Sequence, residues 1–88
     1  MNFGEVIEAM KKDPSKRFAR KGWNGKGMFI YLVEGRTVPL DEWNGDTPVD
    51  HDITINAHVD MKTADDSIIV GWLATQTDML KEDWEEVI

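Results

Sequence analysis

Cysteine is absent from this 88-residue sequence, and histidine occurs only twice, at His51 and His58. Without cysteine there can be no disulfide and no thiolate metal site, and two histidines are too few for a dedicated zinc site. A chain this short buries only roughly 60–65% of its unfolded surface, so a single copy has a small core. Small folds without disulfides or metals are commonly stabilised by a partner subunit. We therefore expect no metal, no cofactor and self-association.

Long apolar runs are also missing. The longest run, from Met28 to Val33, has six residues, whereas a helix that spans a bilayer needs about 20. Residues 1–5 contain neither the basic nor the apolar segment of a secretory signal. These features predict a soluble cytoplasmic protein that does not act at a membrane.

Positive charge is scarce and concentrated in one segment. Residues 11–26 contain seven basic residues and only Asp13 as an acid, a net charge of +6, so the rest of the chain carries −13 of the total of −7. An acidic body repels duplex DNA at long range, which argues against duplex nucleic acid as a partner. The basic segment could receive a small anion, although a solvated helix end and edge strand would have the same composition.

The hydrophobic pattern predicts a single α+β domain over residues 1–88. Asn2 and Glu5 have capping-box spacing, and apolar residues then recur at helical spacing, which predicts a helix over residues 3–12. Two of the three prolines and several acids lie in residues 36–52, which we interpret as a long loop. Alternating or β-rich runs predict five strands, at 17–20, 28–33, 53–59, 67–73 and 83–87. A helical turn is predicted at 77–80, before the last of these strands. We expect the N-terminal helix to pack on an antiparallel sheet of about five strands.

Four tryptophans are many for a chain of this length, and they differ in their neighbours. An indole offers a large flat surface with one N–H donor, so it suits either a core or stacking on a nucleobase. Trp84 lies in a predicted strand, and we assign it to the core. Trp23 and Trp72 each follow a glycine and lie at a turn or strand end with polar neighbours, which favours a ligand-facing role.

Two polar segments adjoin these tryptophans. Residues 22–27 form a glycine-rich turn that could present backbone amides to an anion, with Lys26 adding charge. Its spacing matches no known phosphate-binding fingerprint, and a plain β-turn has the same composition. Residues 73–78 gather hydroxyl, amide and carboxylate groups that could bind a ribose or a base edge, or could simply cap the following helical turn.

For catalysis the sequence offers little. It contains no serine in an elbow motif, no cysteine and no histidine–carboxylate pair at a recognisable spacing. Acids are abundant, so a carboxylate dyad stays open, but no pair stands out. We therefore expect a binding protein with no catalytic residue.

A family resemblance is carried by five segments: NFGEVIEAM at 2–10, ARKGWNGKGM at 19–28, DMKTAD at 60–65, GWLATQTDML at 71–80 and EDW at 82–84. Together they resemble the second class of phage Thoeris anti-defence proteins, small proteins formerly classed as a domain of unknown function. The similarity runs from end to end and leaves only residues 35–58 unsupported. Val70 stands where the family often has proline, which puts the strand geometry there in question.

The resemblance implies a phage immune-evasion protein that sequesters cyclic ADP-ribose isomers such as glycocyclic ADP-ribose, the signals made by TIR-domain Thoeris proteins. It implies a homotetramer in the host cytoplasm that captures the signal without cleaving it, and some members also take up cyclic dinucleotides at separate sites. Carried to this chain, the resemblance makes Trp23 and Trp72 the stacking residues. The other implied ligand contacts are polar side chains at Asn24, Thr75, Gln76 and Asp78, with Arg20 or Lys26 on the pyrophosphate.

Two other functions compete with this interpretation. A small acidic protein could inhibit a host enzyme by direct protein–protein binding, and the charge of −13 outside residues 11–26 suits such mimicry of nucleic acid. A hydrolase of the same signal is the third possibility and ranks last, because no nucleophile is evident. Heat release of a captured signal separates the three, since only a protein that sequesters it returns it intact.

Overall fold

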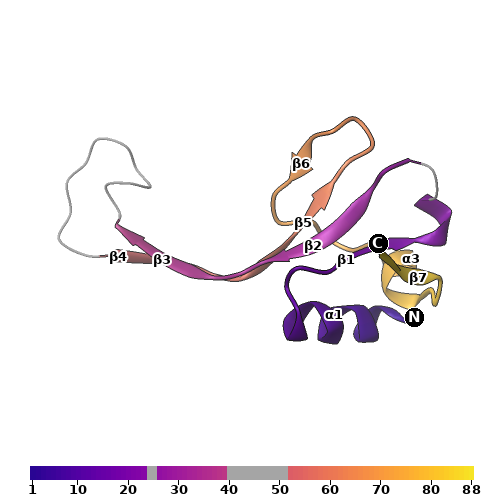
Figure 1. Cartoon of the computed structure of the whole chain (residues 1–88), viewed down its shortest axis with the longest axis horizontal. Helices are drawn as coiled ribbons and strands as arrows, with labels where there is room; N and C mark the ends of the chain where they lie inside the picture. The colour runs from indigo at the N-terminus through magenta and orange to yellow at the C-terminus, as the bar shows by residue number, and fades with distance from the viewer. Residues whose placement is uncertain (24–25, 40–51) are drawn as a thin grey trace.

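The computed structural model describes residues 1–23, 26–39 and 52–88, which form a helix-and-sheet body with a projecting arm (Figure 1). Its elements in chain order are α1 (Phe3–Lys12), β1 (Arg17–Arg20), the 3-10 turn η1 (Lys21–Trp23), β2 (Phe29–Val33), β3 (Arg36–Pro39), β4 (Asp52–Ile55), β5 (His58–Lys62), β6 (Ile68–Ile69), α3 (Gln76–Leu80) and β7 (Trp84–Val87). The residues that matter for the site come from β1, η1, α3 and the segments around them.

The helix α1 has the bounds that the sequence predicts. Asn2 Oδ1 accepts a hydrogen bond from Glu5 N at 2.8 Å, and a Glu5 carboxylate oxygen accepts one from Asn2 N at 2.8 Å, so the capping box is present. These bonds satisfy two N–H groups that a helix start otherwise leaves without partners. Val6 and Met10, one turn apart, are fully buried against the sheet.

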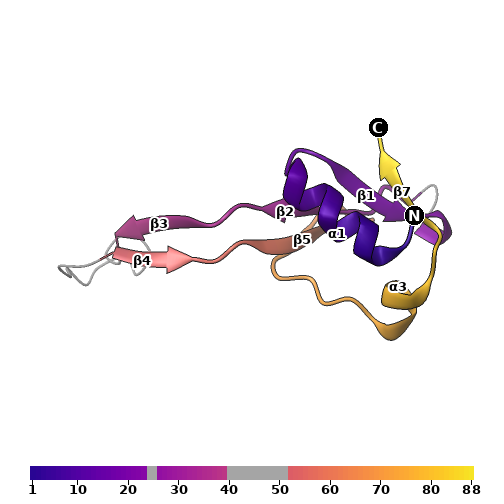
Figure 2. The same cartoon turned by 90° about the horizontal axis from the view of Figure 1, so that it is seen from below.

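The main sheet has five antiparallel strands in the order β6-β5-β2-β1-β7, which confirms the predicted α+β fold. The helix α1 covers one face: it lies below the sheet in Figure 1 and in front of it in Figure 2. Phe18 pairs with Ile30 and Ile30 with Met61, so these three side chains form one row on that face. They pack with Val6, Met10 and Trp84 into the buried core.

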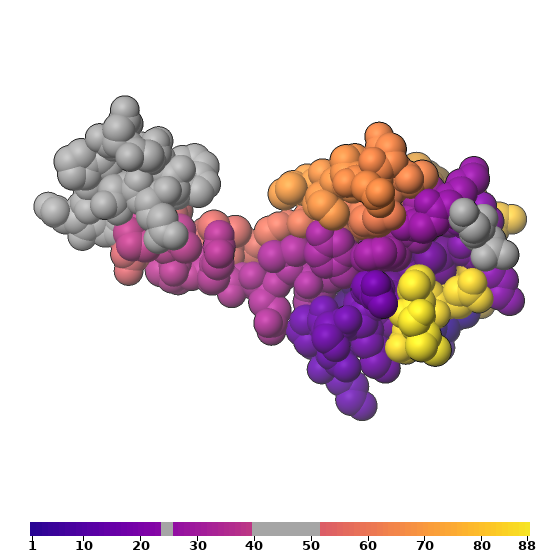
Figure 3. Space-filling model, turned by 45° about the horizontal axis from the view of Figure 1, so that its top comes forward, coloured from indigo at the N-terminus to yellow at the C-terminus, as the bar shows by residue number. Residues whose placement is uncertain are grey.

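A second, two-stranded sheet forms the arm, defined as β3 and β4 (Figure 3). The prediction of a loop over 36–52 was wrong at its ends, because residues 36–39 pair with residues 52–55. Residues 40–51, with Trp43 and His51, lie outside the described part of the chain. Where the arm leaves the body, a Cβ on Gly35 would lie 3.1 Å from both Ala57 N and Ile55 O, so glycine permits this close approach.

Two predicted strands are also shorter than expected. The strand predicted at 53–59 is divided between β4 in the arm and β5 in the main sheet. The strand predicted at 67–73 is paired only at Ile68–Ile69, because Gly71 adopts a φ of +72° and turns the chain. Val70 therefore lies in a turn and not in a strand. No described helix is long and apolar enough to span a bilayer.

Candidate functional site

Three tryptophans and one phenylalanine form an aromatic cluster to which α1, η1, β7 and the segment before α3 each contribute one ring. Trp84 is 1% exposed, which confirms its predicted place in the core. The rings of Trp23 and Trp72 pack on it edge-to-face, with centroids 5.2 and 6.3 Å away, and their own centroids are 6.1 Å apart. Phe3 of α1 closes the cluster, 5.4 Å from the Trp84 ring. Trp23 and Trp72, here called the indole pair, are only half-buried.

The indole N–H groups separate the core tryptophan from the indole pair. Trp84 Nε1 donates to the Asp78 carbonyl oxygen at 2.8 Å and is therefore satisfied inside the fold. The N–H groups of Trp23 and Trp72 donate to none of the residues that the structure describes. No buried side-chain nitrogen or oxygen among those residues lacks a partner, so both N–H groups are accessible from solvent. The indole pair can thus offer two ring edges and two donors to a ligand.

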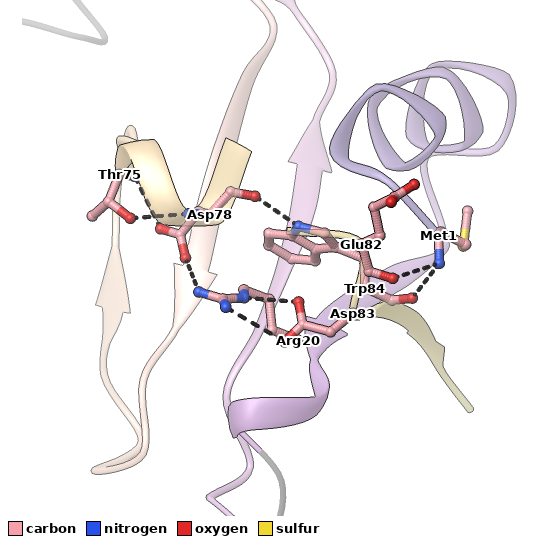
Figure 4. A network of polar contacts seen from close by, with 7 residues as sticks. All are labelled: Met1, Arg20, Thr75, Asp78, Glu82, Asp83 and Trp84. Atoms are coloured by element: carbon pink, nitrogen blue, oxygen red, sulfur yellow. Dashed lines mark hydrogen bonds and ion pairs between the residues drawn. The ribbon is translucent and has the colours of Figure 1, made fainter. Parts of the chain in front are cut away.

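An arginine–carboxylate network lies beside the cluster and holds its parts together (Figure 4). Arg20, at the end of β1, donates from Nε to Asp83 at 3.0 Å and from Nη1 to Asp78 Oδ1 at 2.9 Å. Its side chain is 15% exposed and that of Asp78 is 9% exposed, so this pair lies out of bulk solvent. The network joins β1 to α3 and to the residue before β7.

These contacts shift the acid–base equilibria of all three groups. The hydrogen bond to Asp83, reinforced by Asp78, raises the pKa of Arg20. Burial alone would raise the pKa of Asp78, but hydrogen bonds from Thr75 and Arg20 outweigh it, so the pKa is lowered. The hydrogen bond from Arg20 also lowers the pKa of Asp83. All three groups are therefore charged at neutral pH.

Thr75 and Asp78 form reciprocal hydrogen bonds at the start of α3. Thr75 Oγ1 accepts from Asp78 N at 3.1 Å, and Asp78 Oδ2 accepts from Thr75 N at 2.9 Å, a second capping box. Of the two roles that the sequence left open for residues 73–78, the structure shows helix capping at Thr75 and Asp78. With Arg20 on its other oxygen, Asp78 has a structural partner for each carboxylate oxygen. Ligand contacts by Arg20, Thr75 and Asp78 stay predictions.

Two of the remaining predicted contacts, Lys26 and Gln76, make no bond to another described side chain. Lys26 is exposed, and its backbone N–H donates to the Trp23 carbonyl at 3.1 Å, which closes the turn after η1. Gln76 is exposed at the first residue of α3. Asn24 lies outside the described residues. Lys26 and Gln76 therefore have the freedom to reach a ligand, and their role stays a prediction.

Comparison with known proteins agrees with the resemblance seen in the segments. The model of the Thoeris anti-defense 2-like domain matches residues 1–87. The chain is also 36% identical over 87 residues to the "Thoeris anti-defense 2" protein of Bacillus phage SP01, and the match covers 99% of this chain and 94% of that protein.

The chain belongs to the Thoeris anti-defense 2-like family. This membership places its function in phage countermeasures against Thoeris defence. Both tryptophans of the indole pair lie within the matched length, as does the whole Arg20 network.

The sequence did not indicate several side chains that lie around the site. A hollow of about 240 Å³ adjoins Trp23 and Arg20, and Glu85 and Glu86 also line it. Two carboxylates make this hollow unfavourable for an anion. Alternation in β7 could have indicated Glu85, but Asp83 had no sequence signal as a partner of Arg20. Among the described residues, no three His, Cys, Asp or Glu side chains group as metal ligands.

Proposed function

We propose that this protein counters Thoeris defence by binding and sequestering cyclic ADP-ribose isomers, including glycocyclic ADP-ribose, made by TIR-domain proteins. The observation that carries the proposal is the indole pair: two half-buried rings 6.1 Å apart whose N–H groups are open to solvent. Rings of this kind stack on an adenine, and Lys26 adds a positive charge for the pyrophosphate. Membership of the Thoeris anti-defense 2-like family supports an action against Thoeris defence.

Sequestration requires tight binding, and tight binding requires several contacts together. A nanomolar dissociation constant corresponds to about 12 kcal/mol. Stacking contributes about 1–3 kcal/mol per aromatic contact, and a charge-assisted hydrogen bond about 1.5–3 kcal/mol. In one chain the indole pair lies at the surface, so we propose that a second subunit closes the pocket and that the assembly is a homotetramer. Loss of one indole should then weaken binding roughly ten- to a hundredfold.

We further propose that capture occurs without cleavage and that the protein is not an enzyme. Asp78 and Asp83, the two carboxylates bonded to Arg20 beside the aromatic cluster, are both held ionised by it. An ionised carboxylate bonded to arginine cannot serve as a general acid at neutral pH. The ligand would leave the pocket unchanged, and the signal would be withdrawn in the cytoplasm of the infected cell.

The test is capture and heat release. The protein is mixed with signal-containing lysate, washed, and heated, and the released small molecules are analysed by mass spectrometry. A sequestering protein releases the intact cyclic signal, a hydrolase releases a product of altered mass, and a protein that inhibits a host enzyme releases neither. Either of the last two results would contradict the proposal.

The ligand class is tested by thermal shift with cyclic ADP-ribose isomers and with cyclic dinucleotides, which we propose as second ligands. A ligand at 100 times its dissociation constant stabilises the folded state by about 2.7 kcal/mol. Light scattering of the same samples tests the homotetramer. A melting temperature that no member of the panel raises would count against nucleotide binding.

A further inference from the structure

Asp60 is a buried carboxylate that the proposed site does not use. It lies in β5 and is 6% exposed, and Asp78 is the other buried charged residue in the described part of the chain. Asp78 is paired with Arg20, whereas Asp60 pairs with no lysine or arginine among the described residues. Burying a carboxylate without such a partner is costly. The contacts that Asp60 does make therefore indicate its role.

One oxygen of Asp60 is bonded to the segment that leads into Trp72. Asp60 Oδ1 accepts a hydrogen bond from Gly71 N at 2.9 Å and lies 3.4 Å from His58 Nε2. The other ring nitrogen of His58 lies 2.9 Å from the Asn56 carbonyl oxygen, and a neutral imidazole that donates there has no second N–H for Asp60. Among the described residues, the hydrogen-bond donor to the Asp60 carboxylate is therefore the Gly71 N–H.

Glycine is favoured at position 71 because the backbone there has a positive φ, and not because a side chain would clash. Its φ is +72°, and a Cβ built on it would meet no atom within 4 Å. The next N–H group, that of Trp72, donates to the Val59 carbonyl at 2.7 Å. Two consecutive N–H groups are therefore anchored on β5, the first by the Asp60 side chain and the second by the Val59 backbone. This double anchor sets the direction in which the Trp72 side chain leaves the chain.

We propose that Asp60 is a positioning residue of the indole pair: its carboxylate holds Gly71 in the left-handed conformation and thereby places the Trp72 ring against Trp23. The inference rests on the proposed function, because it assigns Asp60 to the site at which the ligand binds. Asp60 itself does not touch the ligand. It acts through the backbone at Gly71, on the far side of β5 from the core row that contains Met61.

The first test compares two substitutions of Asp60. Asp60→Asn keeps an oxygen that can accept from Gly71 N, whereas Asp60→Ala removes it. With cyclic ADP-ribose as the titrated probe, Asp60→Ala should weaken binding roughly ten- to a hundredfold, and Asp60→Asn should stay within about threefold of the unmodified protein. Asp66→Asn removes an exposed negative charge from the neighbouring turn, keeps a side chain that tolerates the φ of 65° there, and serves as the control, with unchanged binding.

A ligand-free readout accompanies the titration. The indole N–H resonances of Trp23, Trp72 and Trp84 report the cluster directly in a ¹⁵N-correlated NMR spectrum. Asp60→Ala should shift the Trp72 resonance more than that of Trp84, because the Trp84 N–H stays bonded to the Asp78 carbonyl. Gly71→Ala should produce the same shift, since alanine disfavours a positive φ, and Gly71→Asn should shift it less, since asparagine tolerates that conformation better.

The outcomes separate the inference from the proposed function. If Asp60→Asn loses as much affinity as Asp60→Ala, or if Asp60→Ala leaves the Trp72 resonance unchanged, Asp60 is not a positioning residue. If Asp60→Ala fails to fold, the two Gly71 variants decide the matter by the order of their Trp72 shifts, and equal shifts overturn the inference. If the unmodified protein binds no cyclic nucleotide, the proposed function fails, while the Trp72 resonance still tests the role of Asp60.

Discussion

Replacing Arg20 with methionine should destabilise the protein far more than removing an exposed lysine. In Arg20→Met the Asp78 carboxylate, 9% exposed, loses its charged partner but keeps the hydrogen bond from Thr75 N. Breaking a fully buried ion pair costs about 3–5 kcal/mol. Asp83, 30% exposed, regains solvent when Arg20 is lost, so we expect a smaller loss of about 2–3 kcal/mol here. In a domain of this size that lowers the melting temperature by roughly 10–20 °C.

The matched control is Lys16→Met, which removes a basic side chain from the same strand region. Lys16 pairs with Glu86 at 3.4 Å, and the two side chains are 41% and 39% exposed. Exposed ion pairs of this kind contribute about 0–1 kcal/mol. Urea unfolding at neutral pH, followed by tryptophan fluorescence, measures both variants. If their free energies of unfolding differed by less than about 0.5 kcal/mol, the Arg20 network would not be what holds α3 to the sheet.

Three further predictions concern stability and are measured by thermal or urea unfolding. Asn2→Ala removes one half of the first capping box and should cost about 1 kcal/mol; an unchanged midpoint would contradict the assigned cap. Gly27→Ala should cost about 1–2 kcal/mol, because φ is +67° there and a Cβ would lie 3.2 Å from Lys62 Nζ. The lowered pKa of Asp78 means that the unfolded chain binds protons more readily, so its contribution is complete above the ordinary pKa of 3.8 and is lost as pH falls below it. Asp78→Asn should flatten that acid limb, and an equally steep limb would exclude Asp78 as its source.

The sequence predicts the elements that are determined locally. α1 follows from a capping box and a helical apolar pattern, and both are present in the structure. The strand at 36–39 could not be predicted, because its partner begins at residue 52, beyond an acid-rich segment. The end of the strand predicted at 67–73 failed for a related reason: the N–H of Gly71 bonds to the Asp60 side chain and not to a strand.

At the site, the sequence predicts which tryptophan is buried but not how the polar side chains pair. A preceding glycine distinguishes Trp23 and Trp72 from Trp84, and the two are half-buried whereas Trp84 is buried. The partners of Arg20 lie 58 and 63 residues away in sequence, at Asp78 and Asp83. Such separations leave no local pattern, so only the folded chain reveals that Arg20 and Asp78 bond to each other.

In the proposed function, the indole pair binds a flat anionic nucleotide. The most direct test of this binding is isothermal titration of cyclic ADP-ribose isomers into the double variant Trp23→Leu/Trp72→Leu, because leucine keeps apolar packing on Trp84 and removes the ring face and N–H. Tyr31→Leu, a half-buried aromatic on the opposite face of the sheet, is the control. We predict that the double variant stays folded and loses at least about a hundredfold in affinity, while the control binds normally. Undiminished binding by the folded double variant would contradict the account.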